Sequence, residues 1–238
     1  MKETNKKIQK KTKIIPLYPD PHLPPPKEDF RETFQWRIFR IMAEFIEGYH
    51  FLADIRRGIT IFGSTSFTPK DHFYKEAYKL GKLLAENGYT VITGGGPGIM
   101  EAANKGAFMA GGISVGMNIE LPEGQRMNEY VNKPIGFAYF FTRKVMLSFS
   151  SEAFVFFPGG FGTLDEFFEL VTLLQTKKIF KPRPLIAVGK EYWQNLFNWI
   201  QKEVYQKYQA IKKEDLDLIK IVDSAEEAFN FLKKLNSN

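Results

Sequence analysis

The sequence predicts an α/β fold: a Rossmann-like, doubly wound, mainly parallel sheet with helices on both faces and an N-terminal helical extension. From Gly58 onward, short apolar runs alternate with longer segments of helical period. Glycine-rich turns join several of these strand–helix pairs. The run Ala153–Phe157 has the composition of a buried strand, and apolar residues at helical spacing follow it. Strands that alternate with helices in this way form a parallel sheet covered on both faces.

Composition divides the 238 residues into three parts. Residues 1–29 form a basic, proline-rich tail, with six prolines between Pro16 and Pro26 that favour an extended linker. Residues 30–57 carry a broad apolar stripe and are expected to form a helix that packs on the core or at a subunit interface. Residues 58–238 are expected to form the α/β domain.

The elements of this domain follow from where each apolar pattern begins and ends. The expected strands are 59–63, 89–93, 113–117, 136–141, 153–157, 184–188 and 219–222. The expected helices are 70–87, 97–110, 143–150, 163–176, 191–206 and 225–235.

Composition also excludes several classes of protein. Because no cysteine is present, disulfides, thiol nucleophiles and Cys-ligated metal sites are excluded, and a cytoplasmic location is expected. No apolar run approaches the ~18 residues of a membrane span, and no apolar signal core follows the basic N-terminus. The net charge of +6 is concentrated in residues 1–13, which hold six lysines against one glutamate. The near-neutral remainder argues against nucleic acid as a partner; the tail is expected to be solvated, with weak polyanion binding as the alternative.

The nonapeptide Pro158–Glu166, PGGFGTLDE, joins an expected strand to an expected helix. Its glycines allow a ligand to approach the backbone and permit positive φ. The free N–H groups of the new helix, the helix dipole and the Thr163 hydroxyl predict an anion site suited to phosphate. Glu166 is expected in the first helical turn, where its carboxylate faces the same ligand and the dipole helps keep it ionised. A phosphate cradle beside one acid predicts chemistry on a phosphorylated small molecule.

Two other turns at expected strand ends are unusual. Ile61–Ser66 places a glycine and three hydroxyls after the first strand, where they suit a phosphate, a ribose, a base or simply a helix cap. Thr93–Glu101 places three successive glycines after the second strand, so the backbone there passes close to another group. Because Ile99 occupies the last position of a GxGxxG pattern and no Walker A pattern is present, NAD, FAD and P-loop ATP binding are disfavoured. Tight turns without any ligand are the structural alternative.

Arg143 follows the expected strand 136–141, with Thr142 as the expected N-cap of the next helix. A cation at a helix N-terminus opposes the dipole, and a local rule broken without visible compensation often marks function. The alternative is a surface arginine paired with a carboxylate. The three histidines lie outside the unusual turns, so neither a Ser-His-Asp triad nor a histidine-based zinc site is expected.

Together these residues resemble the Lonely Guy (LOG) family of cytokinin-activating phosphoribohydrolases, which also carries the older label "possible lysine decarboxylase". The family signature PGGxGTxxE is matched in full by Pro158–Glu166, and its upstream glycine motif by Gly94–Met100. The family's Arg-Lys pair is matched by Arg143-Lys144, and Gly116–Pro122 resembles the loop after the third strand in longer bacterial members. The resemblance covers about residues 58–222.

The resemblance implies hydrolysis of the N-glycosidic bond of a nucleoside 5′-monophosphate, AMP or an N6-modified AMP, to free base and ribose 5-phosphate, without a cofactor or a metal. It assigns Arg143 and Glu166 as the catalytic pair. Residues expected to bind the phosphate, ribose or base are Gly63, Ser64, Gly94, Gly95, Gly96, Met100, Glu120, Lys144, Gly159, Gly160, Gly162 and Thr163. A homodimer or larger homo-oligomer is also implied. The alternatives are a broader purine or pyrimidine 5′-monophosphate nucleosidase and a non-catalytic nucleotide or cofactor carrier.

Overall fold

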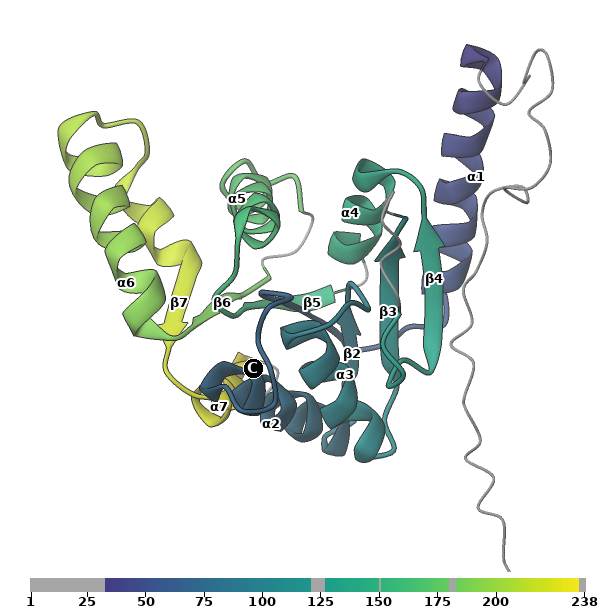
Figure 1. Cartoon of the computed structure of the whole chain (residues 1–238). Helices are drawn as coiled ribbons and strands as arrows, with labels where there is room; N and C mark the ends of the chain where they lie inside the picture. Colours follow the sequence, from purple (N-terminus) through teal and green to yellow (C-terminus); the bar gives the residue numbers. More distant parts are fainter. Residues whose placement is uncertain (1–32, 121–126, 150, 180–182, 236–238) are drawn as a thin grey trace, which may run out of the picture.

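The computed structural model describes residues 33–120, 127–149, 151–179 and 183–235 (Figure 1). Within these residues seven strands form one sheet in the order β4-β3-β2-β1-β5-β6-β7, and all neighbouring strands are parallel. The strands are β1 (Gly58–Phe62), β2 (Thr90–Thr93), β3 (Ser114–Ile119), β4 (Lys133–Phe137), β5 (Ser151–Phe156), β6 (Leu185–Val188) and β7 (Ile219–Val222). This sheet confirms the predicted doubly wound α/β fold.

Helices alternate with the strands along the chain, except that no helix is described between β3 and β4. They are α1 (Phe34–Leu52), α2 (His72–Glu86), α3 (Ile99–Met109), α4 (Phe140–Phe149), α5 (Phe161–Gln175), α6 (Lys190–Trp199) and α7 (Ala225–Leu235). A π-helical segment, η2 (Ile200–Lys207), continues α6, and a 3-10 segment, η3 (Lys213–Leu218), precedes β7.

Helices cover both faces of the sheet, as Figure 1 shows. One layer holds α2, α3 and α7, and the other holds α1, α4, α5 and α6. Because side chains alternate along a strand, β5 contributes Val155 to the apolar cluster under the first layer and Phe154 and Phe156 to the cluster under the second. Full burial of side chains of this size contributes roughly 1.5–3 kcal/mol each.

The strand order reverses next to β1, which pairs with β2 on one side and with β5 on the other. The chain first extends the sheet through β2, β3 and β4, and then returns to add β5, β6 and β7 on the opposite side. In open parallel sheets, ligands bind beyond the carboxyl ends of the strands at such a reversal. The topology therefore directs attention to the turns that follow Phe62 and Phe156.

The helix α1 joins the second layer through a narrow face. Gly48 lies against the thioether of Met146 in α4, so that a side chain at position 48 would collide with it. Phe34, Phe39 and Ile46 are 72%, 62% and 66% exposed, so much of the apolar stripe of α1 does not face the core. At 19 residues α1 is the longest described helix, and no helix in the described ranges has both the length and the apolar character of a bilayer span. The predicted tail 1–29 lies outside the described residues.

The largest errors in the predicted bounds concern β4 and α4. β4 covers Lys133–Phe137 instead of 136–141, and α4 begins at Phe140 instead of 143. Pro134 is tolerated in β4 because this is an edge strand, paired with β3 alone in the described sheet. The aromatic residues that resembled a strand instead start α4, so Thr142 is the third helical residue and not the N-cap.

Candidate active site

Backbone hydrogen bonds join the three unusual turns. The N–H of Ser64, after β1, donates to the carbonyl oxygen of Pro158, after β5, at 3.0 Å. The Ser64 carbonyl accepts in turn from the N–H of Ile99, at the start of α3, also at 3.0 Å. The turns that follow β1, β2 and β5 therefore meet at the carboxyl edge of the sheet.

Glycine is required where these turns touch. A side chain at Gly63 would collide with Ile99, and one at Gly98 would collide with the backbone of Ser64 and Thr65. Gly98 also has a φ of +71°, in the left-handed region that favours glycine. Close packing thus gives Gly63 a structural reason to be glycine, in addition to its predicted role in binding.

The glycine-rich signature turn leads directly into α5. Gly160 is the N-cap residue of α5 and offers no capping side chain, so the N–H groups of Phe161 and Gly162, which precede the first intrahelical bonds, receive no cap from it. A side chain at Gly160 or at Gly162 would meet no described atom within 4 Å. Both positions therefore open onto free space beside the positive end of the helix dipole, as a bound phosphate requires.

The glycines of the signature turn do not use the positive φ that glycine permits. Among the described glycines, that conformation occurs at positions 88, 95, 98, 111 and 189. Gly159 instead packs against the Thr163 side chain, which would collide with any larger residue at position 159. Access to the backbone, and not an unusual backbone angle, is what the glycines at 160 and 162 supply.

Glu166 lies in the second turn of α5 and not in the first, because the helix begins two residues earlier than expected. Only 9% of Glu166 is exposed. Burial raises the pKa of Glu166 to about 7, although the nearby Lys144 and Arg143 favour its ionised form. The start of α5 does not hold the pKa of Glu166 at its ordinary value, because the loss of water has the larger effect at this depth. A carboxyl group that titrates near neutral pH suits general acid–base catalysis.

Lys144 of α4 faces the acidic side of α5. Its Nζ lies 2.9 Å from the Asp165 carboxylate and 2.5 Å from that of Glu169. These two acids are four residues apart and share one face of the helix. Burial alone would lower the pKa of Lys144, but hydrogen bonds to Glu169 and Asp165 leave it raised. Lys144 is therefore charged and tied to α5, and it acts on Glu166 electrostatically.

Arg143 connects α4 to the other side of the site. Its Nε donates to the carbonyl oxygen of Met117 in β3 at 2.8 Å. Its guanidinium packs against Gly94, where a side chain would collide with it and with the sulfur of Met100. Burial lowers the pKa of Arg143 while Glu166 opposes that fall, and an arginine stays charged at physiological pH. The structure thus brings Arg143, Gly94 and Met100 together.

A buried polar network shapes the triple-glycine turn. Thr93 Oγ1 accepts from the N–H of Gly95 at 2.9 Å and donates to Asn104 Oδ1 at 2.6 Å. The backbone N–H of Asn128 donates to the Gly95 carbonyl at 2.8 Å, and its side-chain amide donates to the Gly96 carbonyl at 3.0 Å. Thr93, Asn104 and Asn128 therefore hold the triple-glycine turn in one conformation.

Sequence reasoning missed Asn104 and Asn128. Asn104 is fully buried and lies among small apolar residues of α3, so a polar residue on an apolar helix face was the available signal. Asn128 lies in a connection without a periodic pattern and gives no comparable signal. Glu169, four residues after Asp165, could have been found from helical spacing.

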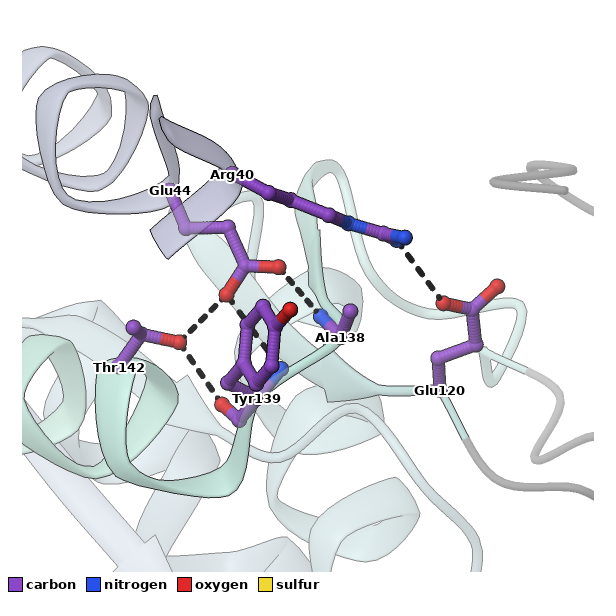
Figure 2. A network of polar contacts seen from close by, with 6 residues as sticks. All are labelled: Arg40, Glu44, Glu120, Ala138, Tyr139 and Thr142. Carbon is purple, nitrogen blue, oxygen red and sulfur yellow. Dashed lines mark hydrogen bonds and ion pairs between the residues drawn. The ribbon is translucent and has the colours of Figure 1, made fainter. Parts of the chain in front are cut away.

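Glu120 and Ser64 have other partners within the protein. The Glu120 carboxylate lies 3.7 Å from the guanidinium of Arg40 in α1 (Figure 2). Burial raises the pKa of Glu120. The Ser64 hydroxyl accepts from the N–H of Ser66 at 3.1 Å and so shapes its own turn. Their predicted contacts with substrate stay predictions. The described residues contain no group of three His, Asp or Glu side chains arranged to hold a metal ion.

Fold and site together define a Rossmann-like α/β protein in which an acid and two cations lie beside a glycine-rich turn at the start of a helix. The model of the family described as "Possible lysine decarboxylase", the older label of the LOG family, matches residues 100–232, more than half of the chain. The chain belongs to this family.

Named relatives agree with the family. The "Probable cytokinin riboside 5'-monophosphate phosphoribohydrolase LOGL5" of Oryza sativa subsp. japonica is 30% identical over 157 residues, which cover 64% of this chain and 62% of the rice protein. The chain thus spans less than two thirds of the length of that relative. The "Cytokinin riboside 5'-monophosphate phosphoribohydrolase LOG1" of Arabidopsis thaliana is 28% identical over 155 residues, 63% of this chain and 71% of the plant protein. Both of these relatives are named as phosphoribohydrolases.

Solved structures share the fold. The molybdenum cofactor binding protein of the phototrophic bacterium Rippkaea orientalis matches with a TM-score of 0.53 and 25% identity over 75% of this chain and 94% of that one. The molybdenum cofactor carrier protein of Chlamydomonas reinhardtii matches with a TM-score of 0.56 and 22% identity over 77% of this chain and 99% of that one. The second likeness shows the fold alone.

Proposed function

We propose that the protein hydrolyses the N-glycosidic bond of a nucleoside 5′-monophosphate, AMP or an N6-modified AMP, and releases the free base and ribose 5-phosphate. One observation carries the proposal. Glu166, a buried acid with a pKa of about 7, lies on the helix whose glycine-rich start is open, and beside the cations Arg143 and Lys144. Relatives named as phosphoribohydrolases of cytokinin riboside 5′-monophosphates support the same reaction.

The start of α5 would hold the substrate phosphate. Backbone N–H groups near Gly160 and Gly162 and the Thr163 hydroxyl donate to an anion there. Thr163 and Glu166 are three residues apart and so lie on one face of the helix. A phosphate at Thr163 therefore leaves the ribose near Glu166. Binding energy from the phosphate would then orient the bond that breaks.

The reaction can be written with the residues present. The C1′–N bond breaks, its electron pair leaves with the base, and C1′ gains oxocarbenium character. The ionised Glu166 carboxylate stabilises that positive charge and accepts a proton from the water that attacks C1′. This proton then passes to the departing base. The Arg143 guanidinium holds the Glu166 carboxylate in place beside C1′. Electrostatic stabilisation of the charge at C1′ by one well-placed group contributes about 3 kcal/mol.

A nucleotide panel tests the proposal. Purified protein is incubated with AMP, N6-prenylated AMP, GMP, IMP, CMP and UMP, and free base and ribose 5-phosphate are quantified by chromatography. Release of base from AMP or its N6-modified form alone is the expected result. Similar rates with all six nucleotides would favour the broader nucleosidase. Absence of base from every nucleotide would contradict hydrolysis.

A non-catalytic carrier is the second candidate. It is favoured by the solved structure of a protein named for binding the molybdenum cofactor. The buried acid at position 166 argues against it, because a carrier gains nothing from a titrating carboxyl group beside its ligand. Tight binding of AMP or of a phosphorylated pterin without release of any fragment would support the carrier.

We also propose that the protein works as a homodimer or larger homo-oligomer. Large exposed apolar side chains on α1 and α4 support this, since monomers rarely leave such residues clustered in water. They include Phe34, Phe39, Ile46, Phe140 and Phe149. Sedimentation analysis should give at least twice the chain mass of 27.5 kDa. A single species at the monomer mass at working concentrations would contradict the proposal.

A further inference from the structure

The helix α4 starts with an unfavourable arrangement of charge. Its first turn contains no acidic residue, and Arg143 and Lys144 are its fourth and fifth residues. Positive charge near a helix N-terminus opposes the helix dipole. A compensating anion is therefore expected close by, and the neighbouring sequence does not supply one.

Glu44 of α1 supplies the anion (Figure 2). Its carboxylate accepts hydrogen bonds from the N–H of Ala138 at 2.8 Å, the N–H of Tyr139 at 3.4 Å and the hydroxyl of Thr142 at 2.5 Å. These donors surround the start of α4. Glu44 is only 8% exposed, so the bonds are shielded from water. A carboxylate from a distant helix thus bonds the two residues that lead into α4 and the hydroxyl of its third residue, and it supplies the negative charge that the local sequence lacks.

The segment that Glu44 holds leads directly to Arg143. The Arg143 N–H donates to the Tyr139 carbonyl oxygen at 3.3 Å, and the Thr142 hydroxyl lies 2.8 Å from the same oxygen. The Arg143 side chain then reaches the Met117 carbonyl in β3 at 2.8 Å. A displacement of the first turn would therefore move the guanidinium away from β3 and from the turn after β2.

A second contact of α1 is made at the end of β3, the strand whose Met117 carbonyl accepts a hydrogen bond from Arg143. Arg40 lies one helical turn before Glu44 on the same face of α1. Its guanidinium is 3.7 Å from the carboxylate of Glu120, the residue that follows β3 (Figure 2). The helix α1 thus contacts both the start of α4 and the end of the strand that carries Met117.

We infer that Glu44 is a positioning residue, which holds the first turn of α4 and thereby fixes the Arg143 guanidinium in the site. The inference rests on the proposed function, because it assigns Glu44 a role in that reaction. Through Glu44, α1 helps to position a residue of the site in addition to packing on the core.

Glu44→Gln tests the role with little change of shape. The amide replaces one acceptor oxygen by a donor, which faces backbone N–H groups and leaves one of them unpaired. Glu47→Gln is the matched control, since Glu47 lies on the same helix, carries the same charge and is exposed. With AMP, we expect Glu44→Gln to lower kcat about tenfold or more, with KM within about threefold, because the phosphate is held by α5. Glu47→Gln should match the wild type.

Two variants of Thr142 repeat the test from the other partner. Thr142→Val removes the hydroxyl that bonds Glu44 and should lower kcat as Glu44→Gln does. Thr142→Ser keeps the hydroxyl, so its kcat should match that of the wild type. The losses in the double variant Glu44→Gln/Thr142→Val should be less than additive. If Glu44→Gln does not fold, the Thr142 pair decides. A kcat for Glu44→Gln or Thr142→Val within about twofold of the wild type would overturn the inference.

Amide hydrogen exchange separates this inference from the proposed function. Without any substrate, Glu44→Gln should speed exchange in residues 140–147 and leave α2 unchanged, while Glu47→Gln alters neither. If the wild type releases no base from any nucleotide, the hydrolytic function fails and the exchange data still test whether Glu44 holds the start of α4. Unchanged exchange in α4 would overturn the inference.

Discussion

The guanidinium of Arg143 packs against the Cα of Gly94, in the space that any side chain at position 94 would need. The contact joins the turn after β2 to α4, and it brings a buried cation to the edge of the sheet where Glu166 lies. Glycine here provides room for a charged group, and the backbone of Gly94 does not use positive φ.

Gly94→Ala should separate stability from activity. The added methyl group collides with the ends of two flexible side chains, Arg143 and Met100, and not with backbone. We expect a loss of about 1–3 kcal/mol in the free energy of unfolding. Displacement of Arg143 should lower kcat for AMP about tenfold or more. Denaturant unfolding and steady-state kinetics measure the two effects, and a wild-type kcat would contradict the assigned position of Arg143.

Gly162→Ala should stabilise the protein while weakening substrate binding. The new methyl group meets no described atom within 4 Å. Alanine is favoured over glycine in a helix by roughly 0.5–1 kcal/mol. The same methyl group would occupy space assigned to the phosphate, so KM for AMP should rise about tenfold. Gly159→Ala is the contrast, because it collides with Thr163 and should destabilise. An unchanged KM in Gly162→Ala would place the phosphate elsewhere.

The pH dependence of activity should report Glu166. Burial raises its pKa to about 7. Because the ionised form acts in the proposed reaction, kcat/KM for AMP should rise with pH and reach half its maximum near pH 7. Lys144→Met removes a cation that favours ionisation, so the midpoint should move to higher pH. A profile that stays flat from about pH 5 to 9 would exclude Glu166 as the titrating group.

The raised pKa of Glu166 should also make the free energy of unfolding fall as pH rises, whereas activity rises. The pKa of Glu166 rises from 4.5 to about 7 on folding, so the unfolded chain releases its proton first. Stability is therefore lost as pH rises from about 4.5 to 7, by at most about 3 kcal/mol. Glu166→Gln carries no charge and should be more stable than the wild type at pH 8, with the difference narrowing toward pH 5. Equal unfolding free energies in urea at pH 8 would contradict this.

Most of the fold could be predicted from local patterns. The central strands are short apolar runs between glycine-rich turns, and the run Ala153–Phe157 predicts β5 to within about two residues. The predicted range of the edge strand β4 lies too far toward the C-terminus, because Lys133 and Pro134 resemble a loop while the aromatic residues after Phe137 resemble a strand. The position of β4 at the edge of the sheet allows Lys133 and Pro134 to belong to the strand, and no local pattern in the sequence encodes that position.

The candidate site was predictable where its residues are neighbours in sequence. The glycines of the signature turn, Thr163 and Glu166 lie within nine residues, so their chemistry is visible at once. The raised pKa of Glu166 was not predictable, because burial depends on helices contributed from elsewhere in the chain. Glu44 was missed for the same reason: its bonded partners lie 94 to 98 residues away.

Comparison of AMP binding with AMP turnover in Glu166→Gln tests most directly whether Glu166 carries the reaction. Isothermal titration should give a Kd for AMP within about threefold of that of the wild type, because the phosphate contacts remain. Chromatography should detect no adenine under conditions in which the wild type converts all of the nucleotide. Release of adenine by Glu166→Gln at the wild-type rate would contradict the mechanism.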